Sequence, residues 1–263
     1  MGDVRPLPFT VSALVLLLAA CSRAGGGVEV EPVGTSSPAS GGTTLTADAS
    51  PSPTAGSGTL VPPSPTPPVP DPLPCGDILV PIDKEHALEP DCEPGDLVPL
   101  PAEATDGGSH LLRREAADAL LRMLDAARAE GHDLYVVSAY RSYRQQEQTF
   151  QYWVSVLGET EARRTSAEPG HSEHQLGTTV DLSSATVGGQ LVEEFGDTPE
   201  GRWLEQNAWR FGFALSYPRG AEGVTGYAYE PWHWRYIGPE VAARWRASGL
   251  TLREFLLREW QGR

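Results

Sequence analysis

The sequence predicts an α+β fold for the larger, carboxyl-terminal part of the chain, and two observations support this prediction. Helical patterns come first in that part and segments of strand composition gather near its end, which favours α+β over a regular alternation of strands and helices. The prolines are unevenly distributed, because 12 of the 24 fall between Ser22 and Pro74. The residues from Cys75 onward are numerous enough to bury the core of one domain.

Each expected element has local signals in its sequence. Ser109 is a suitable N-cap for a first helix that stops at Gly131, and the segment from Ser142 to Gln145 is a capping box for a second. A short apolar run between these two helices is typical of a buried strand. The expected helices are residues 110–130, 143–157 and 198–212, followed by two that open at Pro239 and Thr251; the expected strands are residues 134–139, 213–217 and 226–236.

The first 21 residues have the pattern of an export signal. Residues 11–20 form an apolar run that is too short to span a bilayer, which needs about 20 residues, but that fits a secretory signal. The run ends in Leu18-Ala19-Ala20-Cys21, which resembles the lipobox of bacterial lipoproteins. We therefore expect residues 1–21 to direct export. Cys21 would then be lipidated and anchor the protein at the outer face of the bacterial cytoplasmic membrane or in the cell envelope. An ordinary cleaved signal, with Cys21 incidental, is the alternative.

The next segment has the composition of a linker. Residues 22–74 are rich in Ser, Thr, Gly and Pro and contain few large apolar side chains, so they cannot offset the entropy lost on ordering. We interpret residues 22–74 as a disordered tether and residues 75–263 as the functional domain. Besides Cys21 the chain has only Cys75 and Cys92, and this even pair in an exported domain is expected to form a disulfide.

Charge and lysine content exclude several functions. The net charge of −15 argues against a nucleic-acid partner, because neutralising phosphates requires clustered Lys and Arg. Lys84 is the single lysine of the chain, and Pro81 stands three residues before it. A serine-type peptidase with the S-x-x-K motif is therefore excluded, and the G-x-S-x-G motif is also missing.

Two segments contain the residue types that bind metals, namely residues 170–181 (GHSEHQLGTTVD) and 229–236 (YEPWHWRY). Two imidazoles and one carboxylate make a three-ligand zinc site with the fourth position left for water, and a further carboxylate must carry protons. His174, Asp181 and His233 can serve as the ligands, and Glu230 as the proton carrier. His171 could replace His174, or the two could act as a pair.

The spacing of Glu230 and His233 makes a structural demand. Pro231 lies between them, so they cannot occupy the interior of a regular helix. On a flat strand, residues three apart point to opposite faces. Both can face one metal only if the chain bends or bulges near Pro231 and Trp232.

Together with residues 138–146 (SAYRSYRQQ), these segments resemble the zinc D-alanyl-D-alanine carboxypeptidases and dipeptidases of the VanY and VanX type, the peptidase M15 family. The family signature, SxHxxGxAxD followed by ExxH, is matched by residues 172–181 and 230–233, except that Thr179 replaces the usual Ala. The resemblance covers nearly all of residues 79–249. It implies a small antiparallel sheet flanked by helices, as in Hedgehog signalling domains, and one Zn²⁺ per chain.

The resemblance also implies the role of each site residue. The implied zinc ligands are His174, Asp181 and His233, and the implied catalytic residues are Glu230 as base and Arg141, which stabilises the oxyanion or anchors the substrate. The implied substrate-binding residues are Gln146, Ser172, Tyr217 and Trp232. His171 is then left as a loop residue.

These observations lead us to expect a monomeric D,D-carboxypeptidase that removes the terminal D-Ala from peptidoglycan stem peptides ending in D-Ala-D-Ala. An L,D-carboxypeptidase, a D,D-dipeptidase or a peptidoglycan endopeptidase would use the same site. A non-enzymatic cell-wall-binding module is the third hypothesis, because the Hedgehog domain resembles this fold. The retention of three ligands, a base and Arg141 argues against it.

Overall fold

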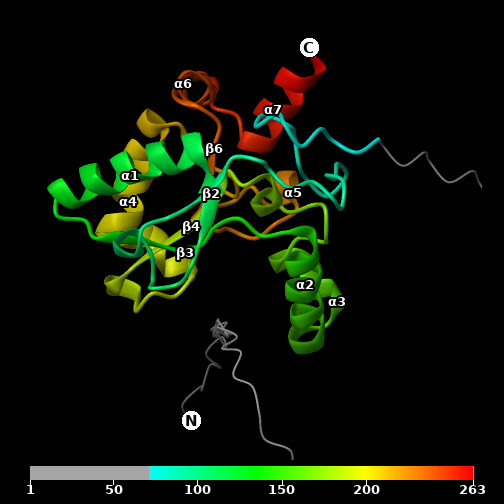
Figure 1. Cartoon of the computed structure of the whole chain (residues 1–263), viewed down its shortest axis with the longest axis horizontal. Helices are drawn as coiled ribbons and strands as arrows, with labels where there is room; N and C mark the ends of the chain where they lie inside the picture. Colours follow the sequence, from blue (N-terminus) through cyan, green and yellow to red (C-terminus); the bar gives the residue numbers. More distant parts are fainter. Residues whose placement is uncertain (1–70, 263) are drawn as a thin grey trace, which may run out of the picture. The chain divides into compact units, whose positions relative to one another are not determined.

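The computed structural model describes residues 71–262, and Figure 1 shows how their helices and strands are arranged. The predicted export signal, Cys21 and nearly all of the predicted tether lie outside these residues. Within residues 71–262, none of the helices combines the length and the apolar character needed to cross a membrane.

The fold is of the α+β class, as the sequence predicted, with small antiparallel sheets and surrounding helices. The strands are β1 (Leu97–Pro99), β2 (Leu111–Arg113), β3 (Leu134–Ser138), β4 (Thr179–Ser184), β5 (Phe213–Leu215) and β6 (His233–Tyr236). The helices are α1 (Arg114–Ala129), α2 (Tyr143–Leu157), α3 (Glu159–Thr165), α4 (Pro199–Asn207), α5 (Glu222–Thr225), α6 (Pro239–Ser248) and α7 (Leu252–Gln261). Short 3₁₀ turns are η1 (Ala102–Ala104), η2 (Glu173–Leu176), η3 (Ala185–Val187), η4 (Glu193–Asp197) and η5 (Ala208–Phe211).

The larger sheet has four antiparallel strands in the order β3-β4-β6-β5, and its register determines which polar side chains lie next to one another. Asp181 of β4 lies opposite His233 of β6, and on its other side it lies opposite Ser138 of β3. Residues directly opposite one another across strands point to the same face of the sheet. These three side chains therefore share one face, which we call the site face. The register of β3 against β4 is irregular between Val136 and Ser138, just before the site.

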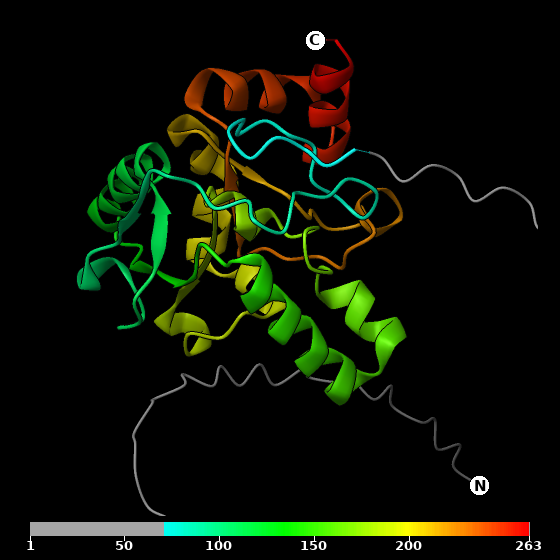
Figure 2. The same ribbon diagram turned by 45° about the vertical axis from the view of Figure 1, so that its right-hand side comes forward.

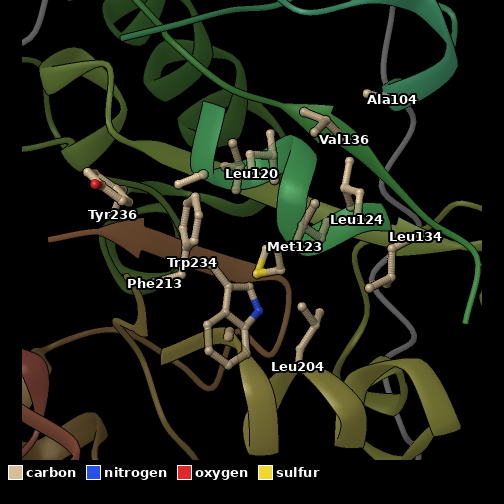
Figure 3. Close-up of a cluster of buried hydrophobic side chains, with 14 of the residues drawn as sticks. Ala104, Leu120, Met123, Leu124, Leu134, Val136, Leu204, Phe213, Trp234 and Tyr236 are labelled. Carbon is tan, nitrogen blue, oxygen red and sulfur yellow. The ribbon is translucent and has the colours of Figure 1, made fainter. Parts of the chain in front are cut away.

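The opposite face of the sheet, which we call the core face, packs against α1 and α4. In Figure 3, Met123 of α1, Leu204 of α4 and Trp234 of β6 converge in one apolar cluster. Val136 and Leu182, which are paired across β3 and β4, are fully buried in the same cluster. Alternation along each strand explains the division, because Trp234 points to this face while its neighbour His233 points to the other.

Other helices lie around this framework. Figure 2 shows α6 and α7 together at the top of the view, and their apolar residues pack with Ala214 of β5 and with Ile237 just after β6. Helices α2 and α3 lie together at the lower right in both views. The segment before β1 is closed into a loop by a disulfide between Cys75 and Cys92, the pairing that the sequence predicted.

Several predicted boundaries need correction. The first helix begins at Arg114 and not near His110, because residues 111–113 instead pair with β1 as strand β2. Its N-cap is Arg113, which makes no side-chain capping bond. The predicted helix 198–212 is divided into α4 and the 3₁₀ turn η5. The predicted strand 226–236 is a strand only over its last four residues.

The folded part also begins earlier than the predicted boundary at Cys75. Leu73 is buried, and its backbone N–H donates to the Ala87 carbonyl at 2.8 Å. Its place in the core cluster with Val80 and Leu88 ties the end of the predicted tether to the domain. Besides β2, four strands and helices had no counterpart among the expected ones, namely β1, β4, α3 and α5.

Candidate metal centre

Three side chains from three different elements converge on the site face: His174 from η2, Asp181 from β4 and His233 from β6. All three are buried, and one ligand atom from each lies within 4.8 Å of those of the other two. His174 Nε2 lies 3.2 Å from Asp181 Oδ2, and His233 Nδ1 lies 3.1 Å from Asp181 Oδ1. The two imidazole rings are almost perpendicular, at 89°.

Gly177 makes this convergence possible, because it reverses the chain between η2 and β4. Its φ of 70° is in the left-handed region, and its N–H donates to the His174 carbonyl at 3.1 Å. A Cβ at this position would come within 2.9 Å of the Leu97 side chain. Glycine alone combines this backbone conformation with this close approach. The reversal places His174 over the start of the strand that carries Asp181.

In each imidazole ring, one nitrogen donates a hydrogen bond within the protein, which leaves the other nitrogen available for a metal ion. His174 Nδ1 lies 2.6 Å from the Ala139 carbonyl, which can only accept, so Nδ1 carries the proton and Nε2 is free. His233 Nε2 lies 2.9 Å from Glu173 Oε2, so that nitrogen donates and Nδ1 is free. Both free nitrogens are the ones that face Asp181.

The residues fit a zinc ion. Asp181 Oδ1 is buried and makes no hydrogen bond within the described residues, although it is close to His233. Two neutral imidazoles and one carboxylate are the nitrogen and oxygen donors that zinc takes in catalytic sites, where three protein ligands leave one position open. Two imidazole nitrogens that both face one buried carboxylate present the polarity that a cation would satisfy.

The protonation of these groups reflects their crowding. Burial alone would lower the pKa of His233, but the Asp181 and Glu173 carboxylates raise it to about 10. Burial alone would raise the pKa of Asp181, and the two imidazoles reverse this and hold it well below its usual range. Burial lowers the pKa of His174. A cation held here therefore takes the place of a proton on His233.

Glu230 lies beside this cluster through the bend that the sequence required. The chain turns at Pro231 and Trp232, and the His233 N–H donates to the Glu230 carbonyl at 3.1 Å. The turn brings a carboxylate oxygen of Glu230 to 3.6 Å from His233 Nδ1. Burial raises the pKa of Glu230 to about 8, with the nearby Asp181 and Glu173 charges adding to this effect. A carboxyl that titrates near neutrality is suited to accept and return a proton.

Arg141 also lies beside the site, immediately before the capping box of α2. Its Nη1 donates to Gln146 Oε1 at 2.7 Å, and its Nη2 donates to Ser138 Oγ at 2.9 Å. Its backbone N–H donates to the His174 carbonyl at 3.2 Å. Burial lowers the pKa of the guanidinium, while the charges of Asp181 and Glu230 act to raise it. The cation is thus held rigidly beside the metal ligands.

The predicted substrate-binding residues occupy different positions. Gln146 is fully buried, and both ends of its amide are used within the protein, on Arg141 and on the Ala167 carbonyl at 2.6 Å, so it supports the guanidinium. The Tyr217 ring is half-buried with its centroid 4.7 Å from that of His233. Ser172 is buried next to η2, and Trp232 is half-buried against the core cluster.

The remaining histidine of the first segment lies apart from the three converging side chains. His171 Nδ1 is 2.7 Å from the Asp83 carbonyl, and the described residues that could hold a metal together do not include it. Sequence reasoning also missed Glu173, Ser216 and Arg235, which meet behind His233. Glu173 is adjacent to His174 in the sequence, but its buried contacts come from residues that are more than forty positions away.

The geometry therefore defines a candidate catalytic zinc centre on a small antiparallel sheet, and comparison with known proteins agrees. The VanY family of D-alanyl-D-alanine carboxypeptidases matches residues 109–239. YodJ of Bacillus subtilis (strain 168), whose name assigns it provisionally as a carboxypeptidase, is 44% identical over 181 residues, which are 68% of this chain and 66% of YodJ.

Two solved structures share the fold. The LD-carboxypeptidase LdcB is 43% identical, with a TM-score of 0.64 over 68% of this chain and 85% of LdcB. The D,D-pentapeptidase VanY of a VanB-type resistance cassette, solved in complex with Zn(II), is 29% identical, with a TM-score of 0.57 over 68% of this chain and 98% of its own. The chain belongs to the VanY family. It spans 66% of YodJ, 51% and 44% of two D-alanyl-D-alanine carboxypeptidases from Enterococcus faecalis and Enterococcus faecium, and 90% of a bifunctional dipeptidase and carboxypeptidase from Enterococcus gallinarum.

Proposed function

We propose that this chain is a zinc-dependent carboxypeptidase that removes the terminal D-Ala from peptidoglycan stem peptides ending in D-Ala-D-Ala. One observation carries the proposal: the largely buried carboxylate of Glu230 lies beside a cluster in which His174 Nε2 and His233 Nδ1 both face Asp181. This is the combination that hydrolysis at a metal requires, since it provides three ligands and a separate group for protons. The family match and the Zn(II)-bound relative support the same activity.

His174 Nε2, an oxygen of Asp181 and His233 Nδ1 would hold the metal. When bound, zinc supplies acidity to a water molecule and polarises a carbonyl group. Glu230 takes a proton from the attacking water and returns it to the amine that leaves, so the proton balance closes within one carboxyl group. In the metal-free protein, burial raises the pKa of Glu230 to about 8, which makes its carboxylate a stronger proton acceptor than an exposed one.

Arg141 would support the peptide from beside the metal ligands, where its backbone N–H donates to the His174 carbonyl. Its bonds to Gln146 and Ser138 fix the plane of the guanidinium before any substrate arrives. A planar, rigidly held cation can pair with a terminal carboxylate or with the oxygen on which charge develops. The protein as a whole is acidic, with a net charge of −15, so a local cation is needed to hold an anionic peptide.

An L,D-carboxypeptidase is the second candidate, and a specific observation favours it. LdcB, an LD-carboxypeptidase, is 43% identical to this chain, whereas the D,D-pentapeptidase VanY is 29% identical. Both reactions release one D-Ala and need the same metal, base and cation. They differ only in the configuration of the residue that precedes the scissile bond, which is recognised by the pocket and not by the metal.

The test uses two defined stem peptides with the zinc-loaded protein. One ends in D-Ala-D-Ala, and the other ends in a single D-Ala that follows an L-centre; mass spectrometry of the products identifies the bond that is cut. We expect the first peptide to lose one alanine and its C-terminally amidated form to react poorly. Faster loss from the second peptide would favour the L,D reaction. Cleavage of an internal bond in the amidated peptide would instead indicate an endopeptidase.

The proposal also includes a location, which depends on residues outside the described part of the chain. The Leu18-Ala19-Ala20-Cys21 motif supports lipid anchoring, and the proline-rich segment after it would separate the domain from the membrane. In a bacterial host, the full chain should incorporate a labelled fatty acid and a Cys21→Ser variant should not. Equal labelling of the two would contradict the anchoring.

A further inference from the structure

We infer that Glu173 is a positioning residue that fixes the metal-binding nitrogen of His233, and that Arg235 holds Glu173 in place. The inference rests on the proposed metal site. It extends the site to a second layer, which we call the Glu173 network and define as Glu173, Ser216, His233 and Arg235.

The network is built on both oxygens of one carboxylate. Glu173 Oε2 accepts from His233 Nε2 at 2.9 Å and from Ser216 Oγ at 2.6 Å. Glu173 Oε1 accepts from Arg235 Nη1 at 2.8 Å. Three donors, from His233, Ser216 and Arg235, face the two oxygens of this side chain, so Glu173 serves as an acceptor on both of them.

Arg235 connects this carboxylate to a distant part of the chain. Its side chain is 0% exposed, and its Nη2 donates to the carbonyls of Ile78 at 2.9 Å and Val80 at 2.7 Å. Both carbonyls lie within the loop closed by the Cys75–Cys92 disulfide. The disulfide-closed loop thus orients Arg235, Arg235 orients Glu173, and Glu173 orients the ring of His233.

Stability alone does not account for such an arrangement. Removing two charges from water costs about as much as their attraction returns, so a buried ion pair is weak evidence for stabilisation. A function for the pair is found at its other end. An acceptor on Nε2 keeps the proton on that nitrogen and leaves Nδ1, the nitrogen that faces Asp181, free for a cation.

Glu173→Gln is a diagnostic change because it preserves shape but converts one acceptor into a donor. A glutamine has one oxygen for two sets of donors, so its NH₂ group must face either Arg235 or the Nε2 of His233. Facing His233, it would favour a proton on Nδ1, where the metal binds. Facing Arg235, it would leave a buried guanidinium nitrogen without its acceptor. Either outcome disturbs the metal-binding ring or its support.

The control is Glu115→Gln in α1, the same substitution at a carboxylate that contacts the other face of strand β6. Tyr236 of β6 donates from its hydroxyl to Glu115 Oε1 at 2.6 Å, so this bond has a length similar to those of the network. Tyr236 belongs to the core cluster, and its hydrogen bond with Glu115 involves none of the three metal ligands. The two variants therefore differ in whether the lost carboxylate supports His233.

The experiment measures zinc affinity of the intact domain by competition with a chromogenic chelator, together with thermal unfolding of each metal-free protein. Loss of the group behind a metal-binding histidine is expected to weaken binding by about 10- to 100-fold. We expect that loss for Glu173→Gln, a smaller loss of a few-fold for Ser216→Ala, and unchanged affinity for Glu115→Gln.

The outcomes separate this inference from the proposed function. A wild-type protein that binds no zinc would overturn the proposed metal site itself. If wild type binds zinc and the folded Glu173→Gln variant binds it with the same affinity, only the positioning role of Glu173 would be overturned. Should Glu173→Gln fail to fold, Ser216→Ala decides, because it removes a single donor to the same oxygen. Wild-type affinity in Ser216→Ala would then overturn the inference.

Discussion

The two faces of the four-stranded sheet are made by alternating residues of the same strands, yet they are stabilised in opposite ways. On the core face, Val136, Leu182 and Trp234 pack against α1 and α4. The polar group among these three side chains is the Trp234 indole N–H, which donates to the Pro231 carbonyl. On the site face, Asp181 and His233 occupy the adjacent positions, equally buried but polar. A shift of one residue in register would exchange the two sets of side chains.

The comparison shows how a fold separates stability from chemistry. Apolar burial is not directional, so the core face supplies free energy and tolerates small adjustments. The site face gains little net free energy from its buried charges, because desolvation offsets attraction. Its polar groups instead define directions, such as the nitrogen of His233 that faces Asp181. Substitutions on the two faces should therefore change different measured quantities.

The largest expected effect lies on the site face and concerns turnover by the zinc-loaded protein. Glu230→Gln removes the group that carries protons but none of the three ligands. We expect it to keep its zinc and its unfolding temperature while losing roughly 10²- to 10⁴-fold in kcat. Turnover of a stem peptide, measured alongside zinc content, checks this. Near-normal turnover in a fully loaded variant would show that another residue carries the proton.

A second effect on turnover is expected at Arg141. Arg141→Ala should reduce kcat/KM by roughly 10²- to 10³-fold, because one preorganised donor to a developing charge is lost. Arg141→Lys should recover only part of this, since lysine lacks the planar fork that Gln146 and Ser138 hold. Steady-state kinetics of the three proteins test the assignment. Full activity in Arg141→Ala would show that Arg141 does not contribute to turnover.

The matching change on the core face should affect stability and leave the metal ligands intact. Trp234→Ala deletes a large side chain that is only 2% exposed, next to His233 in the sequence. Such a cavity costs about 3–5 kcal/mol in the free energy of unfolding. Urea titration of the variant measures the cost, and zinc content of the fraction that remains folded measures the site. A variant as stable as wild type would contradict the division between the two faces.

The smallest expected effect is a pH dependence of the metal-free protein. Burial raises the pKa of Glu230 from its ordinary value near 4.5 to about 8, so the folded state binds this proton more tightly than the unfolded state does. The stability that Glu230 contributes is therefore lost as the pH rises between these two values. Glu230→Gln lacks this loss, so chelator-treated variant should exceed wild type in stability near pH 9 and match it near pH 4. An equal difference at both pH values would show that burial does not perturb Glu230.

Much of the fold could be predicted because its signals are local. The capping boxes at Ser142 and Thr251 both form, since each depends on residues three positions apart. The start of the first helix was wrong because strand β2 depends on β1, a partner that local signals at Ser109 do not reveal. Strand β4 was missed although polar and apolar residues alternate over residues 179–182, because this run is short and its polar residues are buried at the site face instead of facing solvent.

The site shows the same contrast between local and distant information. The spacing of His174, Asp181, Glu230 and His233 was informative because family signatures and the Pro231 bend both constrain it. Glu173 carries no such signal, because its role depends on Ser216 and Arg235, which only the folded sheet brings to it. The sequence predicted the three residues that converge at the candidate metal centre, whereas the residues that contact His233 from behind required the structure.

The most direct test of the account is the zinc content of the isolated domain after gentle purification, measured by elemental analysis in wild type and in His174→Ala. The site face predicts about one zinc per wild-type chain, because three ligands converge there. His174→Ala should retain little or none, while remaining folded through the intact core face. Wild-type protein that holds no stoichiometric metal, and regains none when zinc is added, would contradict the central claim that this face is a metal centre.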